Sequence, residues 1–272
     1  MLSGVLPGVR STVGGMTRTD ANVAALALAT LDLTDLGEST SLENALALAA
    51  RAAEHGVAAV CVWPRYVAAC AEALAGTGVK VATVVNFPSG DEPVADVVAM
   101  TTRAVADGAD EIDVVLPYRA FLAADAGRAE EVLDGVRGAS GDAAVKVIIE
   151  SGELRAPAVI TAAARLAIDH GAQFVKTSTG KSPVSATPEA AEAILAVIAE
   201  QPAAAPRVGF KASGGIRSVA DARVYIEIAD RLLGEDWVSA DTFRFGASSL
   251  LDDVLRVLDG GESAAPESPT AY

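Results

Sequence analysis

The sequence predicts a single-domain α/β protein whose eight parallel strands alternate with helices and close into a TIM barrel. Eight short apolar runs occur along the chain, and a helical stretch follows each of them. Strict alternation of strand and helix, with eight strands in roughly 250 residues, is typical of this barrel. No G-x-G-x-x-G motif follows the first run, which disfavours the alternative of an open doubly wound sheet.

The expected strands are apolar nearly throughout, as buried parallel strands are. A repeated unit of Ala-rich helix, glycine and β-branched run precedes three of them, and it places Gly56, Gly108 and Gly171 where a helix C-cap glycine belongs. In chain order the strands are expected at 28–33, 57–63, 80–86, 111–116, 144–150, 173–178, 207–211 and 242–246.

Three helix beginnings are marked by their own signals. Thr40-Ser-Leu-Glu43 and Ser89-Gly-Asp-Glu92 fit the capping box, in which the first and fourth residues satisfy each other's backbone N–H groups. Thr187-Pro188 puts proline at the first helical position, where its missing N–H costs nothing. We therefore expect a helix to start at each of these points.

The two ends of the chain differ from the middle in composition. Residues 1–20 and 260–272 are rich in Gly and Ser and contain Pro, so we expect both segments to be flexible. Residues 21–259 carry the alternating pattern without a break. We interpret this range as one barrel domain.

Charge and composition exclude several classes of protein. The net charge of −15 argues against general binding to nucleic acid or anionic membranes, so an anionic substrate would need a local basic or backbone-amide pocket. The chain has no apolar run of about 18 residues and no signal-peptide pattern at its start. Two cysteines, Cys61 and Cys70, favour a reducing cytoplasm over a disulfide scaffold. We expect small-molecule partners and a monomer or homodimer.

Polar residues gather at the ends of the predicted strands. In a TIM barrel the active site lies at the carboxyl ends of the strands, because the loops that follow them meet there. Such a concentration of polar groups at one end of apolar strands is hard to explain as packing. The residues concerned are Asp32, Cys61, Asn86, Asp113, Glu150, Lys176, Lys211 and the segment 246–249.

Two lysines on consecutive strands are the strongest chemical signal. Lys176 ends the run QFVK, and Lys211 ends VGFK on the next strand. Neighbouring strands lie about 4.8 Å apart, so equivalent positions bring the two amines close together. Burial and like charge both disfavour protonation, and a neutral amine attacks a carbonyl to form a Schiff base. An alternative for Lys211 is simple phosphate binding.

Asp113 lies on the fourth predicted strand, in EIDVV, with its side chain on the same face as Glu111. A carboxylate within reach of a lysine pair can position water and transfer protons. The alternative is that Asp113 is only the ion-pair partner of a barrel lysine such as Lys146.

Glycine-bearing loops follow the last two strands, at 212–217 and 246–249, and each leads into a helix. Backbone N–H groups at helix starts bind phosphate, and TIM barrels commonly hold one after strands seven and eight. The segment Thr177-Ser-Thr-Gly-Lys181 adds hydroxyl groups and a cation. We therefore predict a phosphate site at these loops.

Metal chemistry is disfavoured by the histidines. There are two, His55 and His170, and each precedes a C-cap glycine, which places it at the end of the barrel opposite the lysines. A catalytic zinc site commonly uses several histidines, and these would have to lie at the catalytic end. We expect neither a metal nor an organic cofactor.

Taken together, these motifs resemble those of the deoxyribose-phosphate aldolase family, which uses a lysine Schiff base on a TIM barrel. The similarity runs from about Leu31 to Tyr272. It rests on LDLTDL, VCVWPRY, TVVNFPSG, ADEIDVVLPYRA, KVIIESGEL, FVKTSTGK, GFKASGGIR and RFGASSLL, in that order. Two departures, Ala212-Ser213 after the second lysine and Trp63 in the second motif, affect the pocket wall rather than the chemistry.

The resemblance implies reversible cleavage of 2-deoxy-D-ribose 5-phosphate to D-glyceraldehyde 3-phosphate and acetaldehyde. It implies that Lys176 forms the Schiff base, that Lys211 lowers its pKa and relays protons, and that Asp113 is the acid–base partner. It also implies that a C-terminal tyrosine, Tyr272, reaches back to the site. The remaining substrate-binding residues would be Asp32 and Thr34 on the sugar, Cys61 in the pocket wall, and Thr179, Gly180, Lys181, Gly214, Gly215, Gly246, Ser248 and Ser249 near the phosphate.

Other readings remain open at the level of sequence. One is an aldolase of the same type that acts on a different sugar phosphate. Another is a pyridoxal-phosphate enzyme, which would also use a barrel lysine and a phosphate site. The third is a non-catalytic sugar-phosphate binding protein, against which the intact set of Lys176, Lys211 and Asp113 argues.

Overall fold

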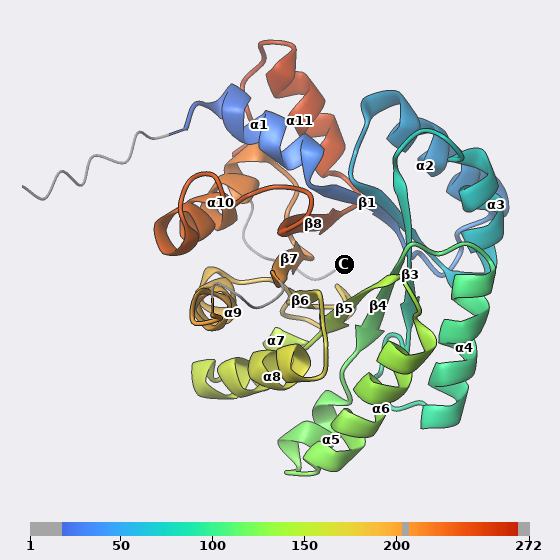
Figure 1. The fold of residues 1–272 in the computed structure, drawn as a ribbon. Helices are drawn as coiled ribbons and strands as arrows, with labels where there is room; N and C mark the ends of the chain where they lie inside the picture. Colours follow the sequence, from blue (N-terminus) through green and yellow to red (C-terminus); the bar gives the residue numbers. More distant parts are fainter. Residues whose placement is uncertain (1–17, 203–206, 266–272) are drawn as a thin grey trace, which may run out of the picture.

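Eight parallel strands close into a barrel in the computed structural model, which describes residues 18–202 and 207–265 (Figure 1). Each strand pairs with the next one in the chain, and β8 pairs with β1 to complete the circle. This confirms the predicted TIM barrel. The strands are β1 (Leu31–Asp35), β2 (Ala59–Val62), β3 (Lys80–Val85), β4 (Glu111–Val115), β5 (Ala144–Ile148), β6 (Phe174–Lys176), β7 (Gly209–Ser213) and β8 (Phe243–Ala247).

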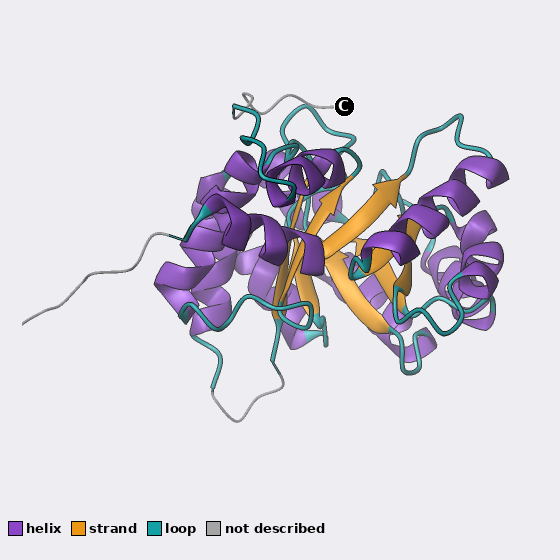
Figure 2. Ribbon diagram, turned by 90° about the horizontal axis from the view of Figure 1, so that it is seen from above, coloured by secondary structure: helices purple, strands orange, loops and turns teal. Residues whose placement is uncertain are grey.

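Helices surround the strands, as both views of the ribbon show (Figures 1 and 2). None of the described helices is both long and apolar enough to cross a membrane. They are α1 (Asp20–Ala29), α2 (Leu42–His55), η1 (Pro64–Tyr66), α3 (Val67–Ala73), α4 (Val94–Ala106), α5 (Tyr118–Leu122), α6 (Ala126–Ala139), α7 (Ser151–Leu154), α8 (Pro157–Asp169), α9 (Pro188–Ala199), α10 (Val219–Leu233) and α11 (Leu250–Leu258).

All eight predicted strands are present, and the largest error concerns the first. We expected it at 28–33, whereas β1 is Leu31–Asp35. Leu28 and Ala29 belong to α1, and Thr30 is its C-cap residue. Apolar residues are frequent on both sides of Thr30, so hydrophobicity alone does not show where the helix ends and the strand begins.

The C-cap glycines and one helix start agree with the predictions. Gly56, Gly108 and Gly171 follow the helices α2, α4 and α8 with φ angles of 66°, 99° and 81°. The Thr187 hydroxyl accepts a hydrogen bond from the backbone N–H of Ala190, with Pro188 at the first position of α9. The three glycines thus mark where helices end, and Thr187 marks where α9 begins.

Both predicted capping boxes were wrong. The N-cap of α2 is Ser41, whose hydroxyl accepts from the backbone N–H of Asn44, while the Thr40 hydroxyl donates to Asp35 at 2.6 Å. The second box precedes Pro93, which is the N-cap of α4, so that helix begins only at Val94. In each case a competing partner or a proline displaces the expected start by at least one residue.

Both described ends of the chain are attached to the barrel. Arg18 donates to Asp230 of α10 at 2.6 Å, and Thr19 caps α1. At the other end, Ser263 and Ala264 donate to the two carboxylate oxygens of Asp253 on α11. The rest of the two predicted flexible segments, 1–17 and 266–272, lies outside the described residues.

The core has two parts of different chemistry. Between strands and helices it consists of aliphatic side chains, and small residues such as Ala45, Ala49 and Ala52 let α2 lie close to the sheet. Inside the barrel, Lys146, Lys176 and Lys211 are among the largest fully buried side chains. Lysine is almost never fully buried without a charged partner, so this interior needs a separate explanation.

Candidate active site

A lysine pair and a shared carboxylate form the centre of the site. Lys176 on β6 and Lys211 on β7 are directly paired in the strand register. Their amines lie 2.9 and 2.8 Å from the same oxygen, Oδ2 of Asp113 on β4. Lys211 and Asp113 are completely buried and Lys176 is 2% exposed. The structure thus brings together the three residues that the sequence predicted as catalytic.

The two amines have opposite protonation tendencies. Burial, with the nearby charge of Lys211, lowers the pKa of Lys176 even though Asp113 opposes the shift. Burial also acts against the charge of Lys211, but Asp113 and Asp32 outweigh it and raise its pKa. The result is an amine next to an ammonium group, which is the arrangement that makes a lysine nucleophilic.

Asp113 remains an anion in this environment. Burial alone would raise its pKa, but Lys146, Lys176 and Lys211 together hold the pKa well below its usual range. Lys146 donates to Oδ1 at 2.9 Å, while the other two lysines use Oδ2. Asp113 is therefore both the partner of the lysine pair and the ion-pair partner of Lys146, two roles between which the sequence alone does not decide.

A further layer of buried charges contacts this centre. Asp32 on β1 accepts from Lys211 at 2.5 Å and from Arg244 on β8 at 2.6 Å. Arg244 also donates to Glu111 on β4 at 2.8 Å, and Lys146 donates to Glu111 at 2.5 Å. The sequence reasoning missed Arg244. The available signal was an arginine within the otherwise apolar run TFRFG of a buried strand.

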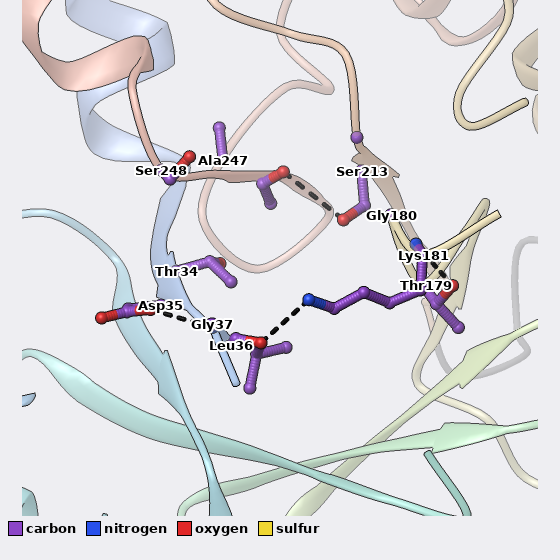
Figure 3. A pocket seen from close by; sticks show the side chains of 12 residues that line it. Thr34, Asp35, Leu36, Gly37, Thr179, Gly180, Lys181, Ser213, Ala247 and Ser248 are labelled. Carbon is purple, nitrogen blue, oxygen red and sulfur yellow. Dashed lines mark hydrogen bonds between the residues drawn. The ribbon is translucent and has the colours of Figure 1, made fainter. Parts of the chain in front are cut away.

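A cavity of about 260 Å³ opens between the carboxyl ends of β1, β6, β7 and β8 and the loops that follow them (Figure 3). Seven of the predicted binding residues line it: Thr34, Thr179, Gly180, Lys181, Gly214, Gly246 and Ser248. The other lining residues are Asp35, Leu36, Gly37, Ser213 and Ala247. A cavity of this size suits a small sugar phosphate.

Lys181 reaches across the mouth of this cavity. Its amine donates to the backbone carbonyl of Leu36 at 2.9 Å, and Figure 3 shows this bond joining the loop after β6 to the loop after β1. The backbone N–H of Lys181 donates a hydrogen bond to the Thr179 hydroxyl at 3.0 Å. A cation at the rim of a pocket lined by glycines is well placed to meet an anionic group.

Glycine is required at position 214 by both conformation and space. Its φ angle of 87° lies in the left-handed region, and a Cβ atom there would come within 2.6 Å of the Ser185 side chain. Gly180 also has a positive φ, of 77°. These conformations keep side chains out of the cavity and leave backbone at its wall.

Four predicted binding residues are not in the cavity wall, and neither are Lys176, Lys211 and Asp113. Asp32 and Cys61 are completely buried, and both oxygens of Asp32 are bonded to cations, so neither residue is exposed to the cavity. Gly215 and Ser249 adjoin lining residues without lining the cavity themselves. Tyr272 lies outside the described residues.

Two other polar residues at strand ends support the loops. Glu150, with φ 51°, accepts from the hydroxyl groups of Thr179 and Ser182 at 2.5 and 3.0 Å. Asn86 donates to the Val115 carbonyl and accepts from the Glu92 N–H, both within 2.9 Å. His55 and His170 follow or end helices that lead into the amino ends of strands, opposite the lysines as predicted.

Fold and site together define a class of protein: a TIM-barrel enzyme with a buried pair of lysines on adjacent strands. The chain belongs to the DeoC/LacD family of aldolases, because the family described as "DeoC/LacD family aldolase" matches residues 20–255. The matched range includes all eight strands and the complete lysine centre.

Individual relatives agree with this family. A deoxyribose-phosphate aldolase of Agrobacterium fabrum is 48% identical over 252 residues, which are 90% of this chain and 95% of the relative. A crystal structure described as a candidate deoxyribose-phosphate aldolase from Coccidioides immitis is 31% identical, with a TM-score of 0.76 and 86% of each chain covered. Another candidate, from Toxoplasma gondii, is 25% identical with a TM-score of 0.81 and covers 89% of this chain and 99% of its own.

Proposed function

We propose that this aldolase cleaves 2-deoxy-D-ribose 5-phosphate reversibly to D-glyceraldehyde 3-phosphate and acetaldehyde through a Schiff base on Lys176. The observation that carries the proposal is the pair of amines on one oxygen of Asp113, with Lys176 as the partner whose pKa is lowered. The name of the relative that is 48% identical supports the choice of substrate.

Lys176 is the nucleophile in this mechanism. Its neutral amine adds to the C1 aldehyde carbon of the open-chain sugar, and water leaves to give an iminium ion. The iminium nitrogen then accepts the electron pair released when the C2–C3 bond breaks, so this electron sink is built by the protein and substrate alone. Glyceraldehyde 3-phosphate leaves and an enamine remains on Lys176.

Asp113 and Lys211 move the protons. Removal of the C3 hydroxyl proton, through water held by Asp113 and Lys211, forms the carbonyl of the departing aldehyde. In the second half of the reaction a proton is returned to C2 of the enamine. Water then hydrolyses the resulting iminium, which releases acetaldehyde and restores the amine of Lys176.

The phosphate group is assigned to the cavity rim. Lys181 provides a cation, and the glycine-bearing segments around Gly180, Gly214 and Gly246 provide backbone at the cavity wall. Binding a remote phosphate supplies energy that positions the reacting carbon over Lys176. Tyr272 is assigned to proton transfer at the enamine carbon on the basis of the family resemblance alone.

One experiment tests the proposal directly. Purified protein with a chelator present is given deoxyribose 5-phosphate, and the two aldehyde products are identified. Borohydride is then added with acetaldehyde, and peptide mapping locates the trapped two-carbon group, which we expect on Lys176. Turnover of a different sugar phosphate alone, or binding without turnover, would contradict the assignment. A label on Lys211 would exchange the roles of the two lysines.

A further inference from the structure

The barrel interior holds a closed group of ionisable residues, which we call the interior charge cluster. It consists of Asp32, Glu111, Asp113, Lys146, Lys176, Lys211 and Arg244. Each is at most 5% exposed, and the group spans the strands β1, β4, β5, β6, β7 and β8. Because these side chains are almost completely removed from solvent, the charges in this cluster must largely balance one another.

The cluster contains one more basic group than acidic groups. Its three carboxylates are Asp32, Glu111 and Asp113, and its four bases are the three lysines and Arg244. If three bases carry a charge, the cluster is neutral. The structure therefore favours one uncharged base among the four.

The ion pairs show which base is matched least well. Among the described residues, Arg244 contacts two carboxylates, Asp32 at 2.6 Å and Glu111 at 2.8 Å. Lys211 also contacts two carboxylates, and Lys146 contacts all three. Lys176 contacts Asp113 alone, and it shares that residue with Lys146 and Lys211.

Arg244 differs from the lysines because its guanidinium does not lose a proton in proteins. It donates hydrogen bonds to Oδ1 of Asp32 and to both carboxylate oxygens of Glu111. Fewer carboxylate oxygens are then left for the lysines. Its geometry is further fixed by a bond from Nε to the Ala240 carbonyl at 2.6 Å. A lysine at this position could itself become the neutral base.

We propose that Arg244 is a positioning residue that makes Lys176 the neutral base of the interior charge cluster. By permanently occupying Asp32 and Glu111, it leaves Lys146 and Lys211 to neutralise the remaining negative charge. Lys176 then has no carboxylate of its own and gives up its proton. This inference rests on the proposed Schiff-base function and explains how a lysine two strands away from Arg244 becomes reactive.

Two further titratable residues interact electrostatically with the cluster, and the described ion pairs include neither of them. Cys61 on β2 is a thiol whose pKa is raised by burial, so it stays neutral. Glu150, after β5, is bonded to hydroxyl groups, and its pKa is also raised by burial. The described ion pairs join neither residue to a cation of the cluster. The titratable residue of β3 is Lys80, which is half exposed and paired with Asp110.

The test removes the charge of Arg244 and then restores the balance by a second change. In Arg244→Gln the cluster has three carboxylates and three bases, so all three lysines are held charged. The pH at which Lys176 is half trapped by acetaldehyde and borohydride should rise by about one unit or more. At neutral pH, the rate of trapping should fall roughly tenfold for each unit by which the pKa of Lys176 rises. Trapping should return at alkaline pH.

The double variant Arg244→Gln/Glu111→Gln separates charge balance from packing. It has two carboxylates and three bases, so the surplus of one base is restored and the pH profile should return toward that of the unchanged protein. Loss of a second set of hydrogen bonds would make a purely structural defect worse. A double variant with the same shifted profile as Arg244→Gln would overturn the proposal.

A control variant and a second Arg244 variant separate the effect of charge from a failure to fold. Arg231→Gln, which removes an exposed arginine paired with Glu192 on the outer face, should leave the profile unchanged. Arg244→Met is a second variant if Arg244→Gln does not fold, and thermal unfolding of every variant is recorded. An unchanged profile in a folded Arg244 variant contradicts this inference alone, whereas failure of the unchanged protein to be labelled on Lys176 contradicts the proposed function.

Discussion

Lys176 and Lys211 occupy the same level of adjacent strands, and both amines are bonded to Oδ2 of Asp113. One carboxylate oxygen therefore holds two amines that differ in the direction of their pKa shifts. In the proposed mechanism, protons therefore pass between Lys176, Asp113 and Lys211 without a large movement of any side chain.

Replacing Lys211 by leucine should lower turnover by roughly 10²-fold or more, the usual scale for loss of an acid–base group. The charge of Lys211 lowers the pKa of Lys176, so its removal should raise that pKa. Trapping of Lys176 should then require higher pH, measured from the pH profile of the borohydride adduct. Lys80→Leu, at a half-exposed lysine on β3, serves as the control.

Replacing Asp113 by asparagine should lower the free energy of unfolding by about 3–5 kcal/mol, the scale for breaking a buried ion pair. The change leaves three lysine amines without their common partner. Asp252→Asn removes a surface ion pair with Arg51 and should cost at most about 1 kcal/mol. Denaturant unfolding of both variants measures the difference, and equal losses would contradict the buried role.

Asp113 also gives stability a defined pH dependence. Its pKa is depressed in the folded protein, so its contribution is present above the unfolded value of about 3.9 and is lost as the pH falls toward the folded value. We expect the unchanged protein to lose stability steadily below about pH 4. The Asp113→Asn variant should lose less stability over the same pH range, because it lacks this titrating group. If the stability of both proteins fell equally steeply with pH, other carboxylates would dominate the acid dependence and the prediction would be wrong.

Changing Gly214 to alanine should weaken binding of phosphorylated substrate. Alanine is strained at φ 87° and its Cβ would press on Ser185, so the loop must shift. We expect a higher KM for deoxyribose 5-phosphate and little change for deoxyribose, which is bound without the phosphate contacts. Gly76→Ala is the matched control, since Gly76 has φ 79° but open space around it.

Charge reversal at Lys181 tests the same subsite in another way. Lys181→Glu puts a carboxylate at the cavity rim and removes the bond to the Leu36 carbonyl. The ratio of kcat/KM for deoxyribose 5-phosphate to that for deoxyribose should fall. Lys181→Gln, which removes the cation without adding an anion, should give an intermediate ratio. A ratio that stays constant across the three proteins would place the phosphate elsewhere.

Deleting Tyr272 should leave trapping on Lys176 and thermal stability nearly unchanged. The step expected to slow is exchange of the acetaldehyde methyl protons with solvent deuterium, because the family resemblance assigns this tyrosine to proton transfer at the enamine carbon. Nuclear magnetic resonance follows the exchange. Tyr272→Phe separates loss of the hydroxyl from loss of the ring, and exchange at the original rate in both variants would remove Tyr272 from the mechanism.

The sequence predicts the barrel well because its signals are local. Each strand is a short apolar run, and glycines such as Gly56 and Gly171 mark where helices end. The errors occur where neighbouring signals merge, as at Thr30 between α1 and β1, or where a side chain has a second partner, as Thr40 has in Asp35.

The site is predictable only in part, for a related reason. Lys176, Lys211 and Asp113 are recognised because charged residues at the ends of buried strands are unusual. Arg244 and Asp32 meet although they are 212 positions apart in the chain, and their pairing depends on barrel closure. Nothing in the local sequence around either residue shows that the other will be its partner.

The pairing of β8 with β1 has a consequence for how the molecule is made. Arg244 comes from the last strand and Asp32 from the first, so these charges meet only when the ring of strands is complete. A nascent chain that lacks β8 has two carboxylates, Asp32 and Glu111, without this cation. The charged interior of the barrel is thus completed only after the segment that forms β8, near the end of the chain, has been synthesised.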